Sequence, residues 1–424
     1  MKTWILVLLL LFVILVAISI YKQTQEGFQN ASIASCKGDS SCQAQATAVS
    51  DLADTRANAG TCVQAIEDFK MADDETCLAN FYTLSCRFAG YVGPFQNGYF
   101  APESAVQSAL RMGCRTFVYE IDYFGELCDY YPRLVVRNAS AISKSVNNKE
   151  TDCNNDQISN LLDTSTAIAQ NAFKKSDDPI IIVLYVLRVP PQTNGMSAEA
   201  YTKRLLQYYS RIAKSLAPLL PYDVSTTIDG NYYRQMNESK LLKNNIEHYQ
   251  RKVLFFSNAQ TEIFRSVTTP VPTNLDLDYI VNLRLTSNQT TFGVTAKTNP
   301  NSNSAKFGIL DSVEDYMAIP DANIVSTEKT ITNGTWTLCL TKDPSAIVPQ
   351  GTADVLQKKF GIHSIPIQIW SPGYDYMFTE KFFKKYSYVP KPPPLRVPMP
   401  GIVIPAPAAI QTDSNHGILK PPTV

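Results

Sequence analysis

The sequence predicts an α/β protein built around a closed barrel of parallel strands. From residue 88 onward, short runs of β-branched and aromatic residues alternate with amphipathic helical segments, which is the pattern of parallel strands joined by crossover helices. The run Ile180–Leu187 is continuously apolar, as expected of a strand that is buried on both faces. The number of such strands favours a closed (β/α) barrel of the TIM type.

The first barrel unit is predicted from residues 88 to 122. A helix is expected with Ala105, Ala109 and Leu110 on its inner face, and Gly113 ends it. The strand Thr116–Ile121 follows, because its residues are β-branched and aromatic.

Further elements follow from the same patterns. Ser197 is a suitable N-cap for a long helix, because its hydroxyl can accept from a free backbone N–H. Periodicity predicts another helix over Gln157–Phe173. Strands are predicted at Leu134–Val136, Ile180–Leu187, Val253–Phe256, Tyr279–Leu285, Trp336–Leu340 and Ile365–Trp370.

Composition excludes one class of partner. The chain has 424 residues and a formal net charge of zero, and it contains no basic run. We therefore expect no binding to nucleic acid. Its apolar content is sufficient for a large core, and without its apolar N-terminus the chain is expected to be soluble and monomeric.

The N-terminus carries a candidate membrane span. Trp4–Ile20 is an uninterrupted apolar run, and a helix needs roughly 20 such residues to cross a bilayer. A cleaved signal peptide is the alternative, but no small-x-small cleavage site follows Ile20. Residues 1–22 are therefore predicted to form an uncleaved single-pass anchor.

The topology of this anchor is predicted from charge. Lys2 and the α-amine precede the span, while Lys22 and Glu26 follow it, which favours a cytosolic N-terminus with the rest on the exoplasmic or lumenal side. Five glycosylation sequons agree with that side of the membrane, and they begin at Asn30, Asn138, Asn237, Asn288 and Asn333.

Cysteine usage points to the same compartment. Residues 23–87 are predicted to form a Cys-rich helical stalk. Cys114, at the junction of a helix and a strand, suits a buried free thiol. Disulfides are expected among the cysteines in polar surroundings, which are Cys36, Cys42, Cys62, Cys77 and Cys86.

The C-terminus is rich in proline. From Pro390 the sequence reads PKPPPLRVPMPGIVIPAPAA, which cannot build a core and favours an extended, polyproline-like chain. The predicted barrel therefore spans residues 88–396, and residues 397–424 are predicted to form a disordered tail. An inert spacer is the favoured role for this tail, and a ligand for a proline-binding domain is the alternative.

Three short motifs in the first unit carry a family resemblance. They are Phe95-Gln96-Asn97-Gly98-Tyr99, Gly113-Cys114-Arg115 and Glu120-Ile121-Asp122. Their order and residue types resemble the opening of the catalytic barrel of the phosphatidylinositol-specific phospholipase C-like phosphodiesterase superfamily. In that family the first motif reads Ser-His-Asn-Thr-Tyr, so Gln96 stands where a histidine is expected.

Later segments extend the resemblance to about a third of the chain. Ala172–Ile182 is similar to the family pattern of Ala-Phe, polar residues, Pro and an apolar strand. Ile365–Trp370 and Tyr388–Arg396 are similar to the last barrel strand and the closing Tyr-x-x-Lys-Pro-x-x-Leu-Arg. With its N-terminal span and proline-rich end, the chain also resembles membrane proteins of large DNA viruses, which would place it in a virion membrane.

The resemblance implies a calcium site and two proton-transferring histidines. Asn97, Glu120 and Asp122 match three of the calcium ligands, although the last two lie two residues further from Gly-Cys-Arg than in the family. The fourth ligand position falls at Tyr185, and the second histidine position falls at Arg137. The implied cofactor is Ca²⁺.

The replaced histidines argue against catalysis. Gln96 cannot exchange a proton near neutral pH, and Arg137 stays protonated. Each positioned acid or base contributes about 10²–10⁴-fold, so the chain is predicted to be a pseudoenzyme in which Arg137 binds the phosphate of a lipid head group or phosphodiester. An active metal-dependent phosphoric diester hydrolase is the alternative, and a third reading makes the barrel a scaffold for its insertions and tail.

Glu120 and Asp122 themselves allow two interpretations. They lie at alternate positions of one strand, so their side chains share a face at the mouth of the barrel. They would either hold a cation or act as structural partners of Arg115 or Arg137.

Overall fold

The structure is a computed structural model of the chain. It describes residues 59–92, 99–123, 132–135, 158–222, 241–267, 271–287, 308–319, 335–343, 346–369 and 383–397, with positions 44, 47, 50, 51, 53 and 54. The predicted anchor and the proline-rich tail from residue 398 onward lie outside these ranges. The start of the proline-rich stretch is described, and its prediction as a segment outside the core is wrong there, because Pro390 ends a strand and Lys391 and Leu395 are buried. Among the described helices, none has the length and apolar character needed to cross a membrane.

The core of the fold is a set of parallel strands. Each strand pairs with the next in the order given, and every pairing is parallel. The strands are β2 (Ser85–Arg87), β5 (Thr116–Asp122), β8 (Ile180–Val186), β9 (Val253–Ser257), β10 (Leu283–Ser287), β11 (Gly308–Ser312) and β12 (Thr337–Leu340). β5 and β8 are buried along their whole length.

An extended segment closes this sheet into a ring. Ser364 forms a parallel bridge with Leu338 of β12, and Ile367 forms one with Cys86 of β2. Backbone hydrogen bonds support both contacts, including Cys339 N to Ser364 O at 3.0 Å and Arg87 N to Ile367 O at 2.9 Å. The predicted parallel barrel is therefore confirmed as a closed ring of backbone pairings.

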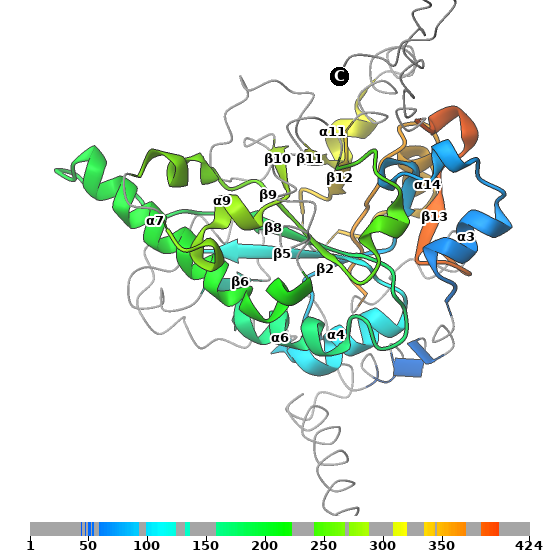
Figure 1. The fold of residues 1–424 in the computed structure, drawn as a ribbon, viewed down its shortest axis with the longest axis horizontal. Coiled ribbons are helices and arrows are strands. Elements are labelled where there is room, and N and C mark those ends of the chain that lie inside the picture. Colours follow the sequence, from blue (N-terminus) through cyan, green and yellow to red (C-terminus); the bar gives the residue numbers. More distant parts are fainter. Residues whose placement is uncertain are drawn as a thin grey trace, which may run out of the picture.

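Three long helices cover one side of the barrel: α4 (Pro102–Arg111), α6 (Leu161–Asn171) and α7 (Ala198–Ser215). In Figure 1, α4 and α6 lie below β5, and α7 runs from the upper left down towards α6. The Ser197 hydroxyl accepts from Ala200 N, which confirms the predicted N-cap. Gly113 follows α4 with φ +93°, a conformation that an L side chain rarely adopts.

Shorter elements fill the connections. Helix α9 (Leu277–Ile280) precedes β10, α11 (Val313–Met317) follows β11, and α14 (Gln350–Lys358) follows β12. Short 3₁₀ helices lie at Asp73–Glu75, Leu78–Asn80, Ala217–Tyr222, Ile246–Tyr249, Thr261–Ser266, Thr273–Leu275 and Pro393–Leu395. The Thr261–Ser266 and Thr273–Leu275 turns are labelled η7 and η8.

Several predicted boundaries need correction. The predicted helix over Gln157–Phe173 begins with strand β7 (Ile158–Asn160), and α6 starts only at Leu161. In the predicted strand Tyr279–Leu285, Tyr279 and Ile280 belong to α9, since Asp276 caps a helical turn there. Strand β11 was not predicted, because Asp311 and Ser312 interrupt its apolar pattern.

The two ends of the described chain join at the base of the barrel, where the N-terminal ends of the strands lie. Helix α3 (Cys62–Asp68) packs beside β13 (Tyr388–Pro390), and β1 (Phe81–Thr83) pairs antiparallel with β13. Figure 1 shows α3, α14 and β13 together at the right. Strand β2 lies within the predicted stalk of residues 23–87, so the barrel begins before residue 88.

The predicted disulfides are wrong for three of the five cysteines. Cys62, Cys77 and Cys86 are free thiols, and each is buried in the core. Their polar sequence neighbours belong to a segment that folds into the barrel rather than into a stalk. Cys114 is a buried free thiol, as predicted. Cys36 and Cys42 lie outside the described residues.

Candidate functional site

The polar mouth of the barrel lies at the C-terminal ends of its strands. In β5, Val118, Glu120 and Asp122 occupy every second position, so their side chains point to the same face of the sheet. Arg87 of β2 stands opposite Val118, and Tyr185 of β8 stands opposite Glu120. Because paired residues in a sheet point to the same side, Arg87, Glu120 and Tyr185 face each other across neighbouring strands.

Glu120 is bound to Arg87. Arg87 Nε donates to Glu120 Oε1 at 2.6 Å, and both side chains are almost fully buried. Arg87 Nη1 also donates to Thr341 Oγ1 at 3.0 Å, which links β2 and β5 to the end of β12. Burial raises the pKa of the Glu120 carboxyl, and the charge of Arg87 opposes that shift.

Asp122 is bound to a second arginine. Arg188, just beyond β8, donates from Nε to Oδ1 at 2.5 Å and from Nη2 to Oδ2 at 2.6 Å. This bidentate geometry is the strongest form of an arginine–carboxylate contact. The Tyr123 backbone N–H also donates to Asp122 Oδ1. The carboxylate is thus held from three directions.

Of the two arginines expected as partners of these carboxylates, only Arg115 is among the described residues. Arg115 lies elsewhere, where its Nη1 donates to Ala172 O at 2.9 Å. Arg137 lies outside the described residues. The interpretation of Glu120 and Asp122 as structural partners of arginines is therefore supported, and the arginines are Arg87 and Arg188.

A two-stranded ribbon extends the mouth beside Asp122. Strand β6 (Arg133–Val135) pairs antiparallel with β5, so that Arg133 stands opposite Asp122. Strand β7 pairs with β6, and Arg133 stands opposite Asn160 there. The predicted strand at Leu134–Val136 is confirmed, with its start one residue earlier. Arg133 is half-buried, and its Nε is buried without a hydrogen-bond partner.

The segment that carries Gln96 and Asn97 connects the two strands of a hairpin next to this mouth. Its stems are β3 (Tyr91–Val92) and β4 (Tyr99–Phe100), which pair antiparallel. Residues 93–98 are outside the described ranges, and these include Gln96, at the position of the family histidine, and Asn97, the predicted calcium ligand. The Arg87 guanidinium lies 4.9 Å from the ring centroid of Phe88, which packs with this hairpin.

Tyr185 does not supply the carboxylate that the fourth ligand position requires. Its side chain is buried opposite Glu120. Burial raises the pKa of its hydroxyl, so it stays neutral.

The described histidines lie away from the mouth. His363 is buried near the base, where Nδ1 is 3.1 Å from Thr337 N, and Nε2 is 2.8 Å from both Ala79 O and Lys391 Nζ. Burial and the Lys391 amine hold the pKa of His363 well below its usual value. His248 belongs to the turn after Asn245, which bridges to Cys77 at the base. His363 is therefore structural.

The carboxylates at the mouth do not fit calcium as they stand. Calcium takes six to eight oxygen ligands, whereas Glu120 and Asp122 each direct an oxygen to a guanidinium. The described part of the chain also contains no group of three His, Cys, Asp or Glu side chains able to hold a metal. No chemical step is therefore routed through a metal here.

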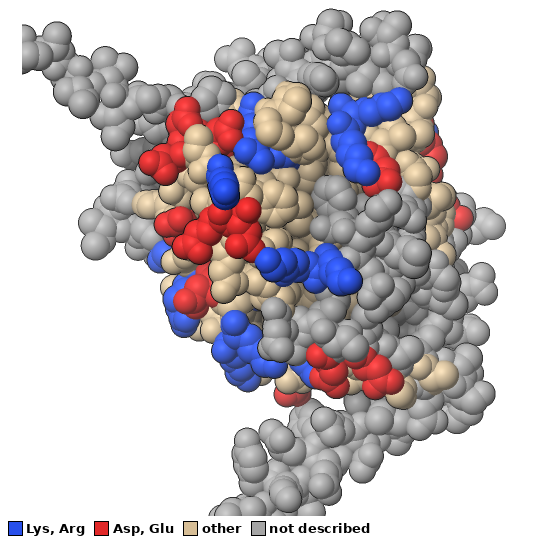
Figure 2. Space-filling model, turned by 90° about the vertical axis from the view of Figure 1, so that its right-hand side faces the viewer, with Lys and Arg blue, Asp and Glu red and all other residues tan. Residues whose placement is uncertain are grey.

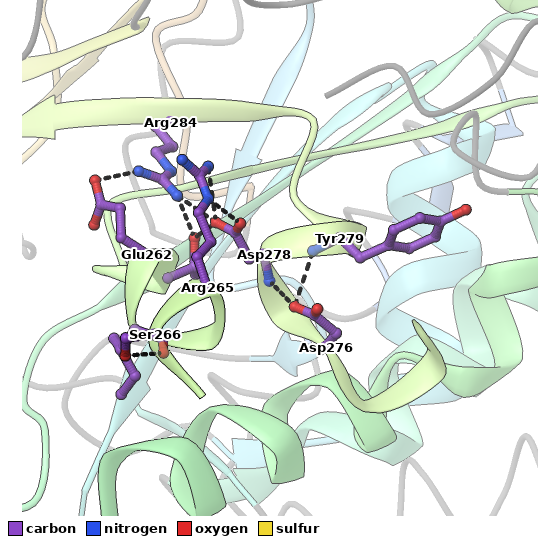
Figure 3. A network of polar contacts seen from close by, with 9 residues as sticks. Glu262, Arg265, Ser266, Asp276, Asp278, Tyr279 and Arg284 are labelled. Carbon is purple, nitrogen blue, oxygen red and sulfur yellow. Dashed lines mark hydrogen bonds and ion pairs between the residues drawn. The ribbon is translucent and has the colours of Figure 1, made fainter. Parts of the chain in front are cut away.

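A second polar network lies beside β10 (Figure 3). Arg284 donates to Glu262 and to Asp278, and Asp278 also accepts from Thr261 Oγ1 at 2.6 Å and Arg265 Nε at 2.7 Å. The two arginines bind Glu262 and Asp278, and the third carboxylate, Asp276, accepts from the backbone N–H groups of Asp278 and Tyr279. The network fastens the connection between β9 and β10, and we regard it as structural.

The described residues of the base form no comparable site. Figure 2 shows the face that carries α3 and α14, where Lys and Arg side chains are interspersed with Asp and Glu. Such a mixed surface has no field of one sign to attract an ion.

Sequence reasoning missed Arg87, Arg133 and Arg188 as residues of the mouth. Each lies at or just beyond one end of a strand in this sheet. A systematic survey of charged residues at predicted strand ends would have found Arg188, which follows Ile180–Leu187 directly. Arg87 was hidden because it had been assigned to the stalk.

Three comparisons bear on this geometry. No family model matches the chain, and no curated protein matches it. PLC21 of L. pealei is similar with a TM-score of 0.47 and 14% identity, over 77% of this chain and 39% of that protein. A calcium-dependent phosphoinositol-specific phospholipase C from Pseudomonas sp. gives a TM-score of 0.43 and 12% identity, over 79% of this chain and 99% of that enzyme.

A Ca²⁺-dependent phosphatidylinositol-specific phospholipase C of Streptomyces antibioticus is also similar, with a TM-score of 0.35 and 10% identity, over 62% of this chain and 83% of that enzyme. These structural neighbours are phosphoinositide-specific phospholipases C. Because all three TM-scores are below 0.5, the description of the barrel rests on the chain's own strand pairings.

Proposed function

We propose that the mouth of the barrel binds a phosphorylated ligand, such as a lipid head group or a phosphodiester, without hydrolysing it. One observation carries this proposal. The two carboxylates of the mouth are paired with Arg87 and Arg188, and the described histidines lie elsewhere.

The described residues of the mouth include no histidine that could transfer a proton. Hydrolysis of a phosphodiester needs a group that takes a proton from the nucleophile and one that gives a proton to the leaving oxygen. The chain has three histidines. His363 and His248 are excluded by position, and His416 belongs to the proline-rich tail. Arginine guanidinium groups hold phosphate but do not exchange protons.

The setting of this barrel is part of the proposal. The apolar run of residues 4–20 supports a single-pass anchor, with the barrel on the exoplasmic or lumenal side. In that setting, the protein would act as a binding or structural component of a membrane.

The test is a hydrolysis assay with the full-length chain. Phosphatidylinositol in vesicles and glycerophosphoinositol in solution are incubated with the protein, with Ca²⁺ or with EDTA, and product is measured by chromatography. We expect no turnover above that of a buffer blank. Calcium-dependent turnover that is abolished by Glu120→Gln would instead establish the active hydrolase.

A gain-of-function variant sharpens this test. Gln96→His, Arg137→His and Tyr185→Glu together restore the residue types that the family resemblance implies. Gln96→His alone is expected to remain inactive, because the second proton-transferring group and the fourth ligand are still missing.

A further inference from the structure

We infer that anion binding at the mouth is independent of divalent cations, because Arg87 and Arg188 occupy the carboxylates that a cation would need, and that Arg133 contacts the bound phosphate. This inference rests on the proposed function. It assigns the anion contact to a residue that neither the motifs nor the family resemblance singles out.

The first step concerns the two carboxylates. Arg87 is buried with Glu120, and Arg188 holds both oxygens of Asp122. A cation that entered between Glu120 and Asp122 would displace a guanidinium. A displaced Arg87 would be left as an uncompensated buried charge, which is strongly unfavourable. The two ion pairs therefore take the place of a metal.

The second step concerns Arg133. It is the cross-strand neighbour of Asp122, and directly opposed residues of antiparallel strands share one face of the sheet. Its side chain thus lies on the face of the mouth. Among the described residues no hydrogen bond or ion pair to its guanidinium is found, and its buried Nε lacks a partner. A buried donor without a partner is unfavourable until an acceptor arrives.

The third step concerns charge. Asp122 and Arg188 neutralise each other, and so do Glu120 and Arg87. Arg133 therefore adds one positive charge that no described carboxylate of the mouth balances. Its planar fork of donors matches two oxygens of a phosphate. A phosphate monoester or diester fits this chemistry, whether it is free in solution or part of a lipid.

Calorimetric titration of the full-length chain in detergent tests the metal independence. Glycerol 2-phosphate is the probe, once with EDTA and once with Ca²⁺. We expect dissociation constants within about twofold of each other. Binding that requires Ca²⁺ would overturn this inference but leave the proposed function standing. The absence of binding in both buffers would overturn the proposed function itself.

Variants test the role of Arg133. Arg133→Gln should weaken binding about tenfold or more, as expected for the loss of a charge-assisted contact, and Arg133→Lys should retain part of the affinity. Arg251→Gln is the matched control, because Arg251 is an exposed arginine in an ion pair with Asp177, near the start of β9. Thermal unfolding of each variant checks that it folds. Unchanged affinity in a folded Arg133→Gln protein would overturn the assignment.

A vesicle arm distinguishes the source of the phosphate. Co-sedimentation is measured with vesicles of phosphatidylcholine that contain or lack phosphatidylinositol phosphate. Binding to the charged vesicles that is lost in Arg133→Gln supports a lipid ligand. Binding of glycerol 2-phosphate alone, with the same loss, supports a soluble phosphate ester.

Discussion

Arg87 Nε lies 2.6 Å from Glu120 Oε1, and this ion pair joins two neighbouring strands inside the barrel with both side chains buried. Burial raises the pKa of Glu120, while Arg87 favours its charged form. The pair is therefore important for stability mainly because a buried charge that has lost its partner is strongly destabilising.

Replacing one partner of this pair should be strongly destabilising. Arg87→Met leaves Glu120 buried without compensation, and we expect it to lower the free energy of unfolding by about 3–5 kcal/mol. The double variant Arg87→Met, Glu120→Leu removes both charges and should recover most of that loss. Urea denaturation of the wild type, both single variants and the double variant measures this cycle. Additive losses in the double variant would contradict the expectation.

Lys391 and His363 predict how stability depends on pH. Burial lowers the pKa of Lys391 from 10.5 to about 7 in the folded protein. Between these values the unfolded chain binds more protons than the folded one, so stability should rise as pH increases from about 7 to 10.5. The pKa of His363 is also lowered, so stability should fall further as pH drops below 6.5.

Lys391→Met isolates the lysine contribution. The variant lacks the titrating amine, so its stability should exceed that of the wild type most at and below about pH 7, by an amount on the order of a few kcal/mol. The difference should shrink as pH approaches 10.5. Urea denaturation at a series of pH values measures it. Parallel profiles for the two proteins would show that the buried amine does not titrate as stated.

The core cysteines should be protected thiols. Burial raises the pKa of Cys77 to about 11 and raises the pKa of Cys62 and Cys339. The pKa of Cys86 is raised by its contact with the Cys114 thiol and by burial. Because the thiolate is the reactive form, these residues should resist alkylation in the native protein and react fully in denaturant. Mass mapping without reduction measures both. A disulfide that involves Cys62, Cys77 or Cys86 would contradict the structure.

Two truncations should separate the tail from the barrel. Removing residues 398–424 deletes only the chain beyond Val397, and we expect the unfolding midpoint to change little. Removing residues 386–424 also deletes β13, whose Tyr388 hydroxyl donates to Pro179 O at 2.9 Å and whose backbone pairs with β1. That variant should unfold at a much lower temperature or fail to fold. Equal midpoints in calorimetry would show that β13 is dispensable.

Local patterns in the sequence determined much of the architecture. The apolar runs predicted β5 and β8, Ser197 predicted the start of α7, and Gly113 predicted the end of α4. Each of these features depends on neighbours within a few residues, since helix caps and strand burial are written into local spacing. The positions of Glu120 and Asp122 on one face of β5 followed in the same way.

Tertiary structure alone decided what those carboxylates do. Arg87 lies 33 positions before Glu120, and Arg188 lies 66 positions after Asp122. Which arginine reaches which carboxylate depends on strand order and register, and a shift of one residue would turn every side chain to the opposite face. Packing also decided that Cys62, Cys77 and Cys86 are buried free thiols. Their polar neighbours in sequence do not indicate that the barrel buries this segment. Spacing along the chain fixes the local elements, whereas contacts between distant strands fix the charges that meet at the mouth.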